Sequence, residues 1–489
     1  MSLIDDTRTA LAHAAQLYAG TSAAPRLKSL RERLDDPLRV AIAGRIKSGK
    51  STLLNALVGE RLAPTNAGEC TRIVTWYQDG HTYRVDVYPR DRPARQARFT
   101  RDEGVLEIDL GSDSPDDVDQ LVVTWPSRAL RTATLIDTPG IGSLTESVSR
   151  RTWELLTVEE DEDAPADAVL YLMKHLHAGD VEFLRAFQDV EVSRPNPINA
   201  IGILSRADEI AVGRIDAMAS ARKIAERLSA DPKVRRVVQT VLPVAGLLGE
   251  TAATLTEAEV QQLRRIATLT PSEVEDLTLS IDRFVNTRPE LGVTDTERMV
   301  LLERFGIFGI RLSTAMLRRG VSSTASELAR ELFDRSGMVD LNNVLNSLFF
   351  ERREVLKSRS ALLALSAVVR TVPVPGSEHV ASEVEQVLAS AHPFNELRVL
   401  SALRAGYIMG KPEVVAELEQ LIGGSGNSSH LRLGLPSDVD PEQLRQAAFA
   451  ALSRWQRRAE NPITSYELAT ASRVVVRSCE GILADLQRR

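Results

Sequence analysis

The fold of this chain is decided by Gly44–Ser51, which reads GRIKSGKS and fits the phosphate-loop pattern G-x-x-x-x-G-K-[ST]. The apolar run LRVAIA at 38–43 precedes it and predicts a buried strand, and TLLNAL at 52–57 follows it and predicts a helix. A strand, a glycine-rich loop and a helix in this order define a loop that holds phosphate groups. We therefore expect a nucleotide-binding α/β domain built around this loop.

Each part of the loop has its own physical role. Gly44 and Gly49 permit backbone geometry that a side chain would block, so successive N–H groups can face phosphate oxygens. The N-terminus of the following helix adds free N–H groups and the positive end of the helix dipole. Lys50 supplies a mobile positive charge for the outer phosphates, and the hydroxyl of Ser51 is placed to bind Mg²⁺. We expect two further residues to bind the nucleotide, namely Ser48 and Thr52.

Composition sets limits on the class of protein. The chain has 489 residues, of which 43% are hydrophobic and 26% charged, which is ordinary for a soluble globular protein of two or more domains. A net charge of −7 and an aromatic content of 4% argue against a nucleic-acid partner, which would need a basic surface and stacking platforms. Two cysteines far apart, Cys70 and Cys479, indicate a reducing cytoplasm. The sequence predicts no signal peptide or membrane span, so we expect any membrane contact to be peripheral.

Strand and helix patterns alternate from residue 38 to about 285, which predicts a mainly parallel sheet flanked by helices. We expect the runs 72–77 and 83–88, joined through Asp79-Gly80, to form a hairpin. The other predicted strands are 38–43, 121–125, 133–136, 168–173, 199–204 and 239–244.

Helical patterns dominate after residue 290. The longest runs from 338 to 370 and carries apolar residues at intervals of seven, which favours packing in a helical bundle. Residues 423–439, with the sequence GGSGNSS, predict a loop. The expected domains are an N-terminal helical segment that packs on the bundle (1–36), a nucleotide-binding domain (37–288) and an elongated all-α bundle or stalk (289–489). The remaining predicted helices are 297–319, 322–336, 378–391, 394–408, 412–422, 440–459 and 465–487.

A second motif, Asp137-Thr138-Pro139-Gly140, follows the apolar strand ATLI. A carboxylate at this strand end can reach Mg²⁺, usually through water, and the N–H of Gly140 can meet the γ-phosphate. Thr71, in a polar stretch after the first helix, can supply a second hydroxyl ligand to the metal, with Thr65 as the competing candidate. The predicted metal ligands are therefore Ser51, Thr71 and Asp137.

Base recognition is expected after a late strand, where the chain reads ILSRAD at 203–208. Asp208 can accept two hydrogen bonds from guanine, and the stem of Arg206 can pack on the ring. Ser205 and Arg206 depart from the usual [NT]-K-x-D, and Asp208 alternatively caps the helix that follows. A loop at a later strand end, Ala245-Gly246, is expected to contact the guanine oxygen through its backbone.

The four motifs in this order resemble a GTPase, and the long helical remainder resembles the dynamin-like branch. The resemblance is strongest to the mycobacterial isoniazid-inducible dynamin-like proteins of the shorter, C type. It implies GTP hydrolysis with Mg²⁺, self-association through the GTPase domains, a possible second dynamin-like partner, and remodelling or maintenance of the cytoplasmic membrane at its inner face through anionic lipids. The stretches that carry it are GRIKSGKSTLLNALVGERLAPTNAGECTRIVTW, SRADEIAVGRIDAM, LLERFGIFGIRLS and LIGGSG.

Lys47 stands where dynamins usually have a small polar residue that helps a bound monovalent cation neutralise charge during hydrolysis. We hypothesise that its ammonium replaces that cation, the alternative being a solvent-facing lysine that only raises nucleotide affinity. Ile141 follows Gly140, so no glutamine is available to orient water, which predicts slow basal turnover that rises with protein concentration. The predicted catalytic residues are Lys47, Lys50, Thr71 and Gly140.

The segment 362–375, LLALSAVVRTVPVP, ends the longest helix in an apolar turn with two prolines. Residues 370–376 are a candidate membrane-contacting tip, whereas the alternative places these side chains in the bundle core. Gly306 and Gly309 lie near the expected junction of domains and are candidate hinges. Two rival functions stay open, a soluble regulatory GTPase acting on a protein partner and a nucleotide-binding adaptor without hydrolysis.

Overall fold

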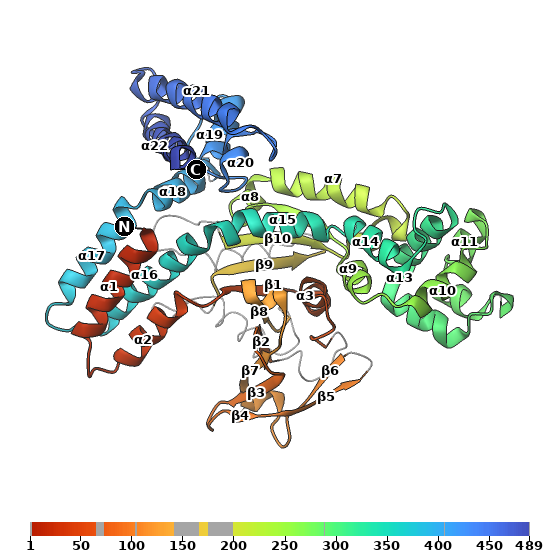
Figure 1. Cartoon of the computed structure of the whole chain (residues 1–489). Coiled ribbons are helices and arrows are strands. Elements are labelled where there is room, and N and C mark those ends of the chain that lie inside the picture. Colours follow the sequence, from red (N-terminus) through yellow and green to blue (C-terminus); the bar gives the residue numbers. More distant parts are fainter. Residues whose placement is uncertain are drawn as a thin grey trace.

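The computed structural model describes residues 2–64, 73–102, 105–140, 166–174, 199–287, 289–404 and 406–488. A nine-stranded sheet forms its centre, with the order β11-β10-β9-β1-β8-β2-β7-β3-β4 (Figure 1). Its middle strands are parallel, so their carboxyl ends meet at one edge of the sheet. The strands of this sheet are β1 (Leu38–Gly44), β2 (Val74–Gln78), β3 (Arg84–Pro89), β4 (Arg95–Gln96), β7 (Val118–Thr124), β8 (Ala133–Asp137), β9 (Ala168–Met173), β10 (Ala200–Ser205) and β11 (Val241–Val244).

The predicted hairpin of 72–77 with 83–88 is wrong. β7 lies between the two strands, pairing in parallel with β2 and antiparallel with β3. The side chains of Leu121 and Val123 on β7 are fully buried. This burial favours insertion of β7 between β2 and β3 over direct pairing of those two strands. Three short strands were not predicted: β4 and a separate two-stranded sheet of β5 (Arg98–Asp102) and β6 (Val105–Asp109).

Helices cover the sheet and extend from it in groups (Figure 1). One group, which we call the arm, joins the start of the chain to two helices from its second half: α1 (Leu3–Leu17) and α2 (Ala24–Arg33) pack on α16 (Arg353–Thr371) and α17 (Ser377–Ser390). The helices next to the sheet are α3 (Lys50–Val58), α4 (Arg128–Thr132), α7 (Ala217–Ala230), α8 (Pro232–Arg235), α9 (Gly246–Ala253) and α15 (Met338–Leu348).

Two further groups of helices lie to the right of the sheet and at the upper left in Figure 1. The first consists of α10 (Glu257–Ile266), α11 (Pro271–Leu277), α12 (Ile281–Asn286), α13 (Asp295–Arg318) and α14 (Ala325–Arg335). The second, which we call the C-terminal lobe, consists of α18 (His392–Arg404), α19 (Pro412–Leu421), α20 (Ser429–Leu433), α21 (Pro441–Glu460) and α22 (Tyr466–Arg488). The fold class is confirmed, a mainly parallel sheet flanked by helices with a helical C-terminal region, although the helices after 289 are distributed over several groups.

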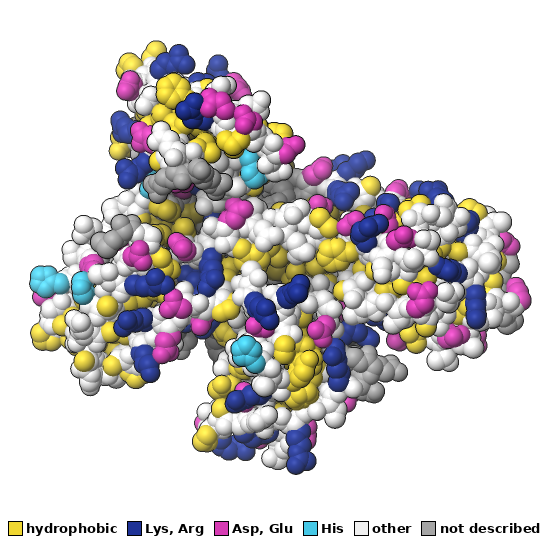
Figure 2. Space-filling view, in the orientation of Figure 1, with side chains coloured by type: hydrophobic (Ala, Val, Ile, Leu, Met, Phe, Trp, Pro, Cys, Tyr) yellow, Lys and Arg dark blue, Asp and Glu magenta, His cyan; other side chains and the backbone are white. Residues whose placement is uncertain are grey.

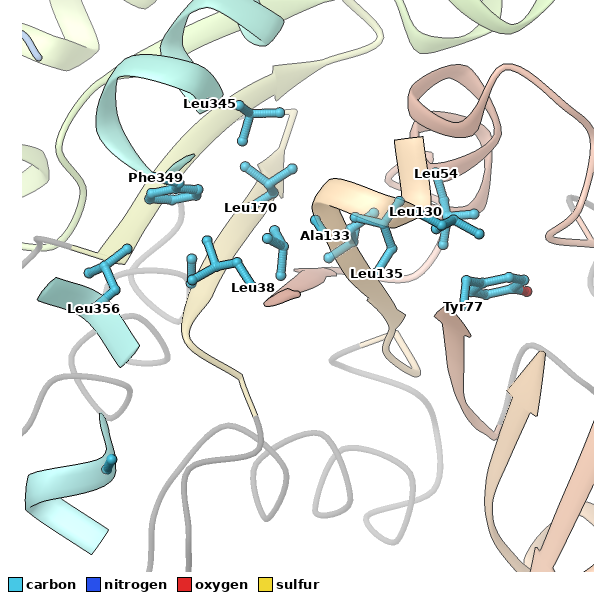
Figure 3. Close-up of a cluster of buried hydrophobic side chains, with 14 of the residues drawn as sticks. Leu38, Leu54, Tyr77, Leu130, Ala133, Leu135, Leu170, Leu345, Phe349 and Leu356 are labelled. Carbon is cyan, nitrogen blue, oxygen red and sulfur yellow. The ribbon is translucent and has the colours of Figure 1, made fainter. Parts of the chain in front are cut away.

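The predicted helix 338–370 is broken into α15, a 3₁₀ turn (Phe350–Arg352) and α16. Phe349 turns into the core at the break and is fully buried. Figure 3 shows it in one cluster with Leu345, Leu170 and Leu38, which come from α15, β9 and β1. Packing against the sheet therefore overrides the heptad pattern at this point, and α16 begins with a new direction.

The candidate tip is the turn between α16 and α17 at one end of the arm. The proline rings of Pro373 and Pro375 are exposed, but Val372 and Val374 are partly buried against the core. The tip assignment stays a prediction, and these two valines contribute to packing. Among the described residues, no helix is long and apolar enough to cross a membrane.

Candidate nucleotide-binding site

The loop Gly44–Ser51 lies at the carboxyl end of β1, in the middle of the sheet. Gly44 has φ +147°, and a Cβ atom placed there would lie 2.5 Å from the carbonyl oxygen of Leu172 on β9. Gly49 has φ +93° at the start of α3. Lys47 adopts φ +60° with an exposed side chain, an uncommon conformation for a residue with a Cβ. The loop is thus held in a strained shape of the kind found at functional sites.

Lys50 is turned back over this loop. Its Nζ donates to the carbonyl oxygens of Gly44 and Arg45, both at 3.3 Å. Burial lowers the pKa of its ammonium, and the nearby Asp137 acts in the opposite direction. Because the hydrogen bonds that this buried ammonium makes in the described structure go to loop carbonyls, it can donate instead to phosphate oxygens, which are stronger acceptors.

Ser51 and Asp137 meet at the edge of the loop. The Oγ of Ser51 donates to Oδ2 of Asp137 at 2.9 Å. The other oxygen, Oδ1, is buried and has no hydrogen-bond partner within the described ranges. Burial raises the pKa of this carboxyl, although Lys50 opposes the shift. An orphaned carboxylate oxygen beside a hydroxyl fits the oxygen ligands that Mg²⁺ prefers.

The 137–140 motif is hydrogen-bonded to β1 and packs against the phosphate loop. Both the N–H and the hydroxyl of Thr138 donate to the carbonyl of Ile42 on β1. Gly140 lies so close to Ile46 that an added Cβ would be 2.8 Å from the Cα of Ile46. Only glycine allows this approach, so the two predicted phosphate-binding segments lie against each other.

One cavity of about 150 Å³ joins the phosphate loop to the predicted base-recognition segments. It opens beside Ser48, Gly49 and Thr52, and it extends past β9 and β10. The structure therefore brings together residues more than 190 positions apart. The side of the cavity opposite the phosphate loop is formed by Ser205, Arg206, Asp208, Glu209, Val244, Gly246 and Leu247.

Asp208 lies in the wall of this cavity at the start of the 3₁₀ segment η4 (Ala207–Gly213). Burial raises the pKa of its carboxyl to about 6. Arg206 adopts φ +53°, and its Nη1 donates to Oε1 of Glu209 at 2.6 Å. Lys174 donates to the other oxygen of Glu209 at 3.2 Å. Glu209 therefore positions the arginine stem at the rim and leaves the carboxylate of Asp208 to face the cavity.

The second base-recognition loop is supported from the helical region. The N–H of Ala245 donates to the carbonyl of Ser336 at 2.8 Å, and Gly246 begins α9. Gly337 has φ +83°, and a Cβ there would lie 2.3 Å from the carbonyl oxygen of Pro243. The turn between α14 and α15 therefore packs directly on the loop that borders the cavity.

Gly306 interrupts α13 beside Asp208. It has φ +60° and ψ 176°, which kinks the helix. A Cβ at Gly306 would lie 3.8 Å from Oδ2 of Asp208 and 3.7 Å from Leu247. Sequence reasoning singled out this glycine as a hinge but did not connect it with the base pocket, because the contact joins segments almost 100 residues apart.

Most predicted site residues meet in this one region. Thr71, its competitor Thr65 and Ile141 lie outside the described residues. Sequence reasoning missed Glu209 and Leu247, which line the cavity next to predicted residues. The signal for Glu209 was its spacing, because a carboxylate three positions after Arg206 can pair with that arginine.

The fold and the site together define a P-loop nucleotide-binding protein with a helical arm. Residues 40–206 match the model of the Dynamin family. The isoniazid-induced protein IniC of Mycobacterium tuberculosis is 41% identical over 499 aligned residues, which cover all of this chain and all of the relative. The chain therefore belongs to the dynamin family of GTPases, among the relatives of IniC.

More distant relatives match parts of the chain. The bacterial dynamin-like protein of Nostoc punctiforme is 32% identical over 21% of this chain and 16% of its own length. A solved structure of an oligomerised bacterial dynamin pair covers all of this chain and 76% of that chain, with 12% identity and a TM-score of 0.31. A score this low has no bearing on how the helical groups are arranged.

Proposed function

We propose that the protein binds GTP with Mg²⁺ in this cavity and hydrolyses it slowly to GDP and phosphate. The observation that carries the proposal is the Ser51–Asp137 pair beside the phosphate loop, with a buried Asp137 oxygen left unpartnered in the described structure. A hydroxyl and a carboxylate at this place are the protein ligands of magnesium in P-loop nucleotidases. Membership of the dynamin family supports hydrolysis as the outcome of binding.

Each residue of the loop would have its own role in binding the nucleotide. Backbone N–H groups from Gly44 to Gly49 would face the β-phosphate, and Lys50 would leave its carbonyl partners for phosphate oxygens. Ser51 and Asp137 would hold Mg²⁺, with Thr71 as a further proposed ligand. The metal, when bound, neutralises charge on the β- and γ-phosphates. The N–H of Gly140 would meet the γ-phosphate from the opposite side.

Guanine is the base that the far end of the cavity supports best. The Asp208 carboxylate would accept from N1–H and the 2-amino group, a donor pair that adenine lacks. Arg206, fixed by Glu209, would cover one face of the ring with its apolar stem. The backbone of Ala245 and Gly246 would contact the guanine oxygen.

Substitution of Asp208 by Asn tests the assignment of the base. An amide presents one donor and one acceptor, which suits xanthine better than guanine, because xanthine carries a carbonyl oxygen at C2 where guanine has its amino group. We expect Asp208→Asn to weaken GTP binding at least tenfold, because a hydrogen bond to a charged group contributes about 1.5–3 kcal/mol, and to gain affinity for XTP. Asp216→Asn, an exposed carboxylate outside the cavity, is the matched control. Equal GTP affinity of both variants would reject the base site.

Two contacts support a coupling of nucleotide binding to the helices. The Ala245 loop is bonded to Ser336 before α15, and α15 leads through the break at Phe349 into the arm. Gly306 places the kink of α13 next to Asp208. We propose that nucleotide-dependent shifts of these two loops move α13 and the arm relative to the sheet, and that GTPase domains associate during the cycle.

On the basis of the family, we propose that the protein acts at the inner face of the cytoplasmic membrane. It would contact anionic lipids there, with a possible second dynamin-like partner. A soluble regulatory role is the second candidate, and the partly buried Val372 and Val374 favour it, since they leave little apolar side chain exposed at the tip. Sedimentation with anionic vesicles separates the two. Binding that Pro373→Asp abolishes supports the tip, whereas no binding in any nucleotide state supports the soluble switch.

A further inference from the structure

A second charged cavity lies where the arm meets the C-terminal lobe, far in sequence from the nucleotide site. Its volume is about 200 Å³. It is bordered by the end of the turn before α16, by α18, by the loop that starts at Ile422, and by α22. The polar residues that line it are Arg352, His392, Glu396, Asn427, Ser429, Arg432, Arg477, Ser478 and Asp485.

Arg352 is the unusual member of this set, because it is a buried cation that forms no ion pair within the described residues. Its side chain is only 3% exposed, and Nη2 donates to the carbonyl of Gly423. Its Nη1 is buried without a hydrogen-bond partner, and no carboxylate of the described residues lies within ion-pair distance. Burial and neighbouring arginines lower the pKa of its guanidinium to about 10, which leaves it charged at neutral pH. A buried charge of this kind is costly unless a partner is supplied.

The carboxylates around Arg352 either have other partners or are exposed to solvent. Glu351 is exposed and accepts from the N–H of Asn427 at 3.2 Å, and Asp485, which lines the cavity, is also exposed. Glu396 accepts from Nη1 and Nη2 of Arg432 at 2.6 and 2.9 Å, and from Ser478 at 2.6 Å. Burial would raise the pKa of Glu396, but its hydrogen bonds, with His392 first, lower it to about 2, so it stays ionised. Arg404, the third buried arginine nearby, pairs with Glu419 at 2.9 Å. Of these three buried arginines, Arg352 is therefore the one that has no ion pair in the described structure.

The guanidinium groups of Arg352 and Arg432 converge on Gly423. A Cβ at Gly423 would lie 2.7 Å from Nη2 of Arg352 and 3.3 Å from Nη2 of Arg432. The Nε of Arg432 and the Oγ of Ser428 are also buried without partners in the described structure. Two of these unpaired donors, Nη1 of Arg352 and Nε of Arg432, belong to residues that line the cavity, and the exposed Arg477 lines it as well.

We propose that this cavity is a binding site for a phosphate-bearing anion. A phosphate accepts several hydrogen bonds at once and suits the planar donor fork of arginine, so it would satisfy Arg352 and Arg432 together. Charges of both signs are interspersed over the face drawn in Figure 2, which shows no broad basic surface. The proposed recognition rests on the arginines that line the cavity. A bound anion would tie the start of α16 to α18 and α22, and so fasten the arm to the C-terminal lobe.

Inorganic phosphate titrated calorimetrically into the full-length protein, with and without saturating GDP, is the first test. The site predicts a saturable component that GDP does not displace. Arg477→Gln is expected to weaken this component about tenfold through loss of one charge-assisted hydrogen bond, whereas Arg473→Gln, one turn earlier on α22 and outside the cavity, leaves it unchanged. Absence of a GDP-independent component, or equal effects of the two variants, overturns the proposal.

A second variant separates the site from a purely structural arginine. Arg352→Gln removes the unpaired charge and keeps a donor for Gly423, so its Tm without phosphate should equal or exceed that of the wild type and should not respond to phosphate. A lower Tm that still rises with phosphate as in the wild type contradicts the site.

Vesicles of phosphatidylcholine with phosphatidic acid then distinguish the source of the phosphate group. Sedimentation that Arg477→Gln and free phosphate both reduce identifies a lipid headgroup, and phosphate binding without sedimentation identifies a soluble anion.

Discussion

The hydroxyl of Ser51 donates to the carboxylate of Asp137 across 2.9 Å, although the two residues are 86 positions apart. The first stands at the start of α3 and the second at the end of β8, which is directly paired with β1. This contact closes the phosphate loop against the next strand of the sheet. It leaves the second Asp137 oxygen buried and without a partner in the described residues.

Ser51→Ala therefore predicts a loss that depends on magnesium. We expect its affinity for GTP with Mg²⁺ to fall about tenfold or more, because the proposed metal ligand is removed, while its affinity in EDTA equals that of the wild type. Titration with a fluorescent GTP analogue under both conditions measures this. Ser51→Thr keeps the hydroxyl and should restore the wild-type value. An equal loss with and without Mg²⁺ would show that the serine acts only in folding.

Guanine binding should depend on pH through Asp208. Its carboxyl has a pKa of about 6 in the free protein, raised by burial, and only the ionised form accepts from guanine. As the pH falls through 6 the carboxyl takes up a proton, so GTP affinity should decrease by up to tenfold per pH unit below that value. Binding curves between pH 5 and 8 test this, with Asp208→Asn as the control that lacks the transition. A flat wild-type curve would contradict the role of the carboxylate.

Lys47 offers a test of charge compensation during hydrolysis. The residue is exposed, in a left-handed conformation, and its role as a built-in cation stays a hypothesis. If its ammonium stabilises developing charge, Lys47→Ala should lower kcat at saturating GTP about tenfold or more, and potassium should restore part of the loss. Arg45→Ala, an exposed cation in the same loop, is the matched control. Unchanged turnover of Lys47→Ala would leave the lysine with a role in affinity alone.

Gly306 should connect helix geometry with nucleotide affinity. Its φ of +60° and ψ of 176° suit glycine alone, so Gly306→Ala should lower the free energy of unfolding by about 1–3 kcal/mol. It should also weaken GTP binding, because the kink lies beside Asp208. Gly320→Ala, at φ +66° in open space after the same helix, should cost stability without changing nucleotide affinity. Chemical denaturation and GTP titration of both variants measure the two effects separately.

The local parts of the site could be predicted from the sequence. The strand, loop and helix around Gly44–Ser51 are encoded by neighbouring residues, and β1 and α3 begin or end within two residues of the predicted limits. The same holds for the segments that end in Asp137 and Asp208. Their meeting at one edge follows from the parallel order of the strands, which alternating strand and helix patterns already indicate.

The tertiary choices could not be predicted in this way. The runs 72–77 and 83–88 do not indicate that β7 lies between them, because the pairing of two strands also depends on other strands of the chain that can pair with either one. The heptad pattern of 338–370 does not show the break, which arises because Phe349 is buried against the sheet. The unpaired charge of Arg352 depends on three chain segments and is visible only once they are packed together.

GTP turnover measured over a wide range of protein concentration, with and without anionic vesicles, tests the central claim most directly. The account predicts that GTP and not ATP is consumed, that Mg²⁺ is required, and that the rate per subunit rises with concentration as GTPase domains associate. Absence of GTP hydrolysis above the rate in buffer, or equal consumption of ATP, would contradict it.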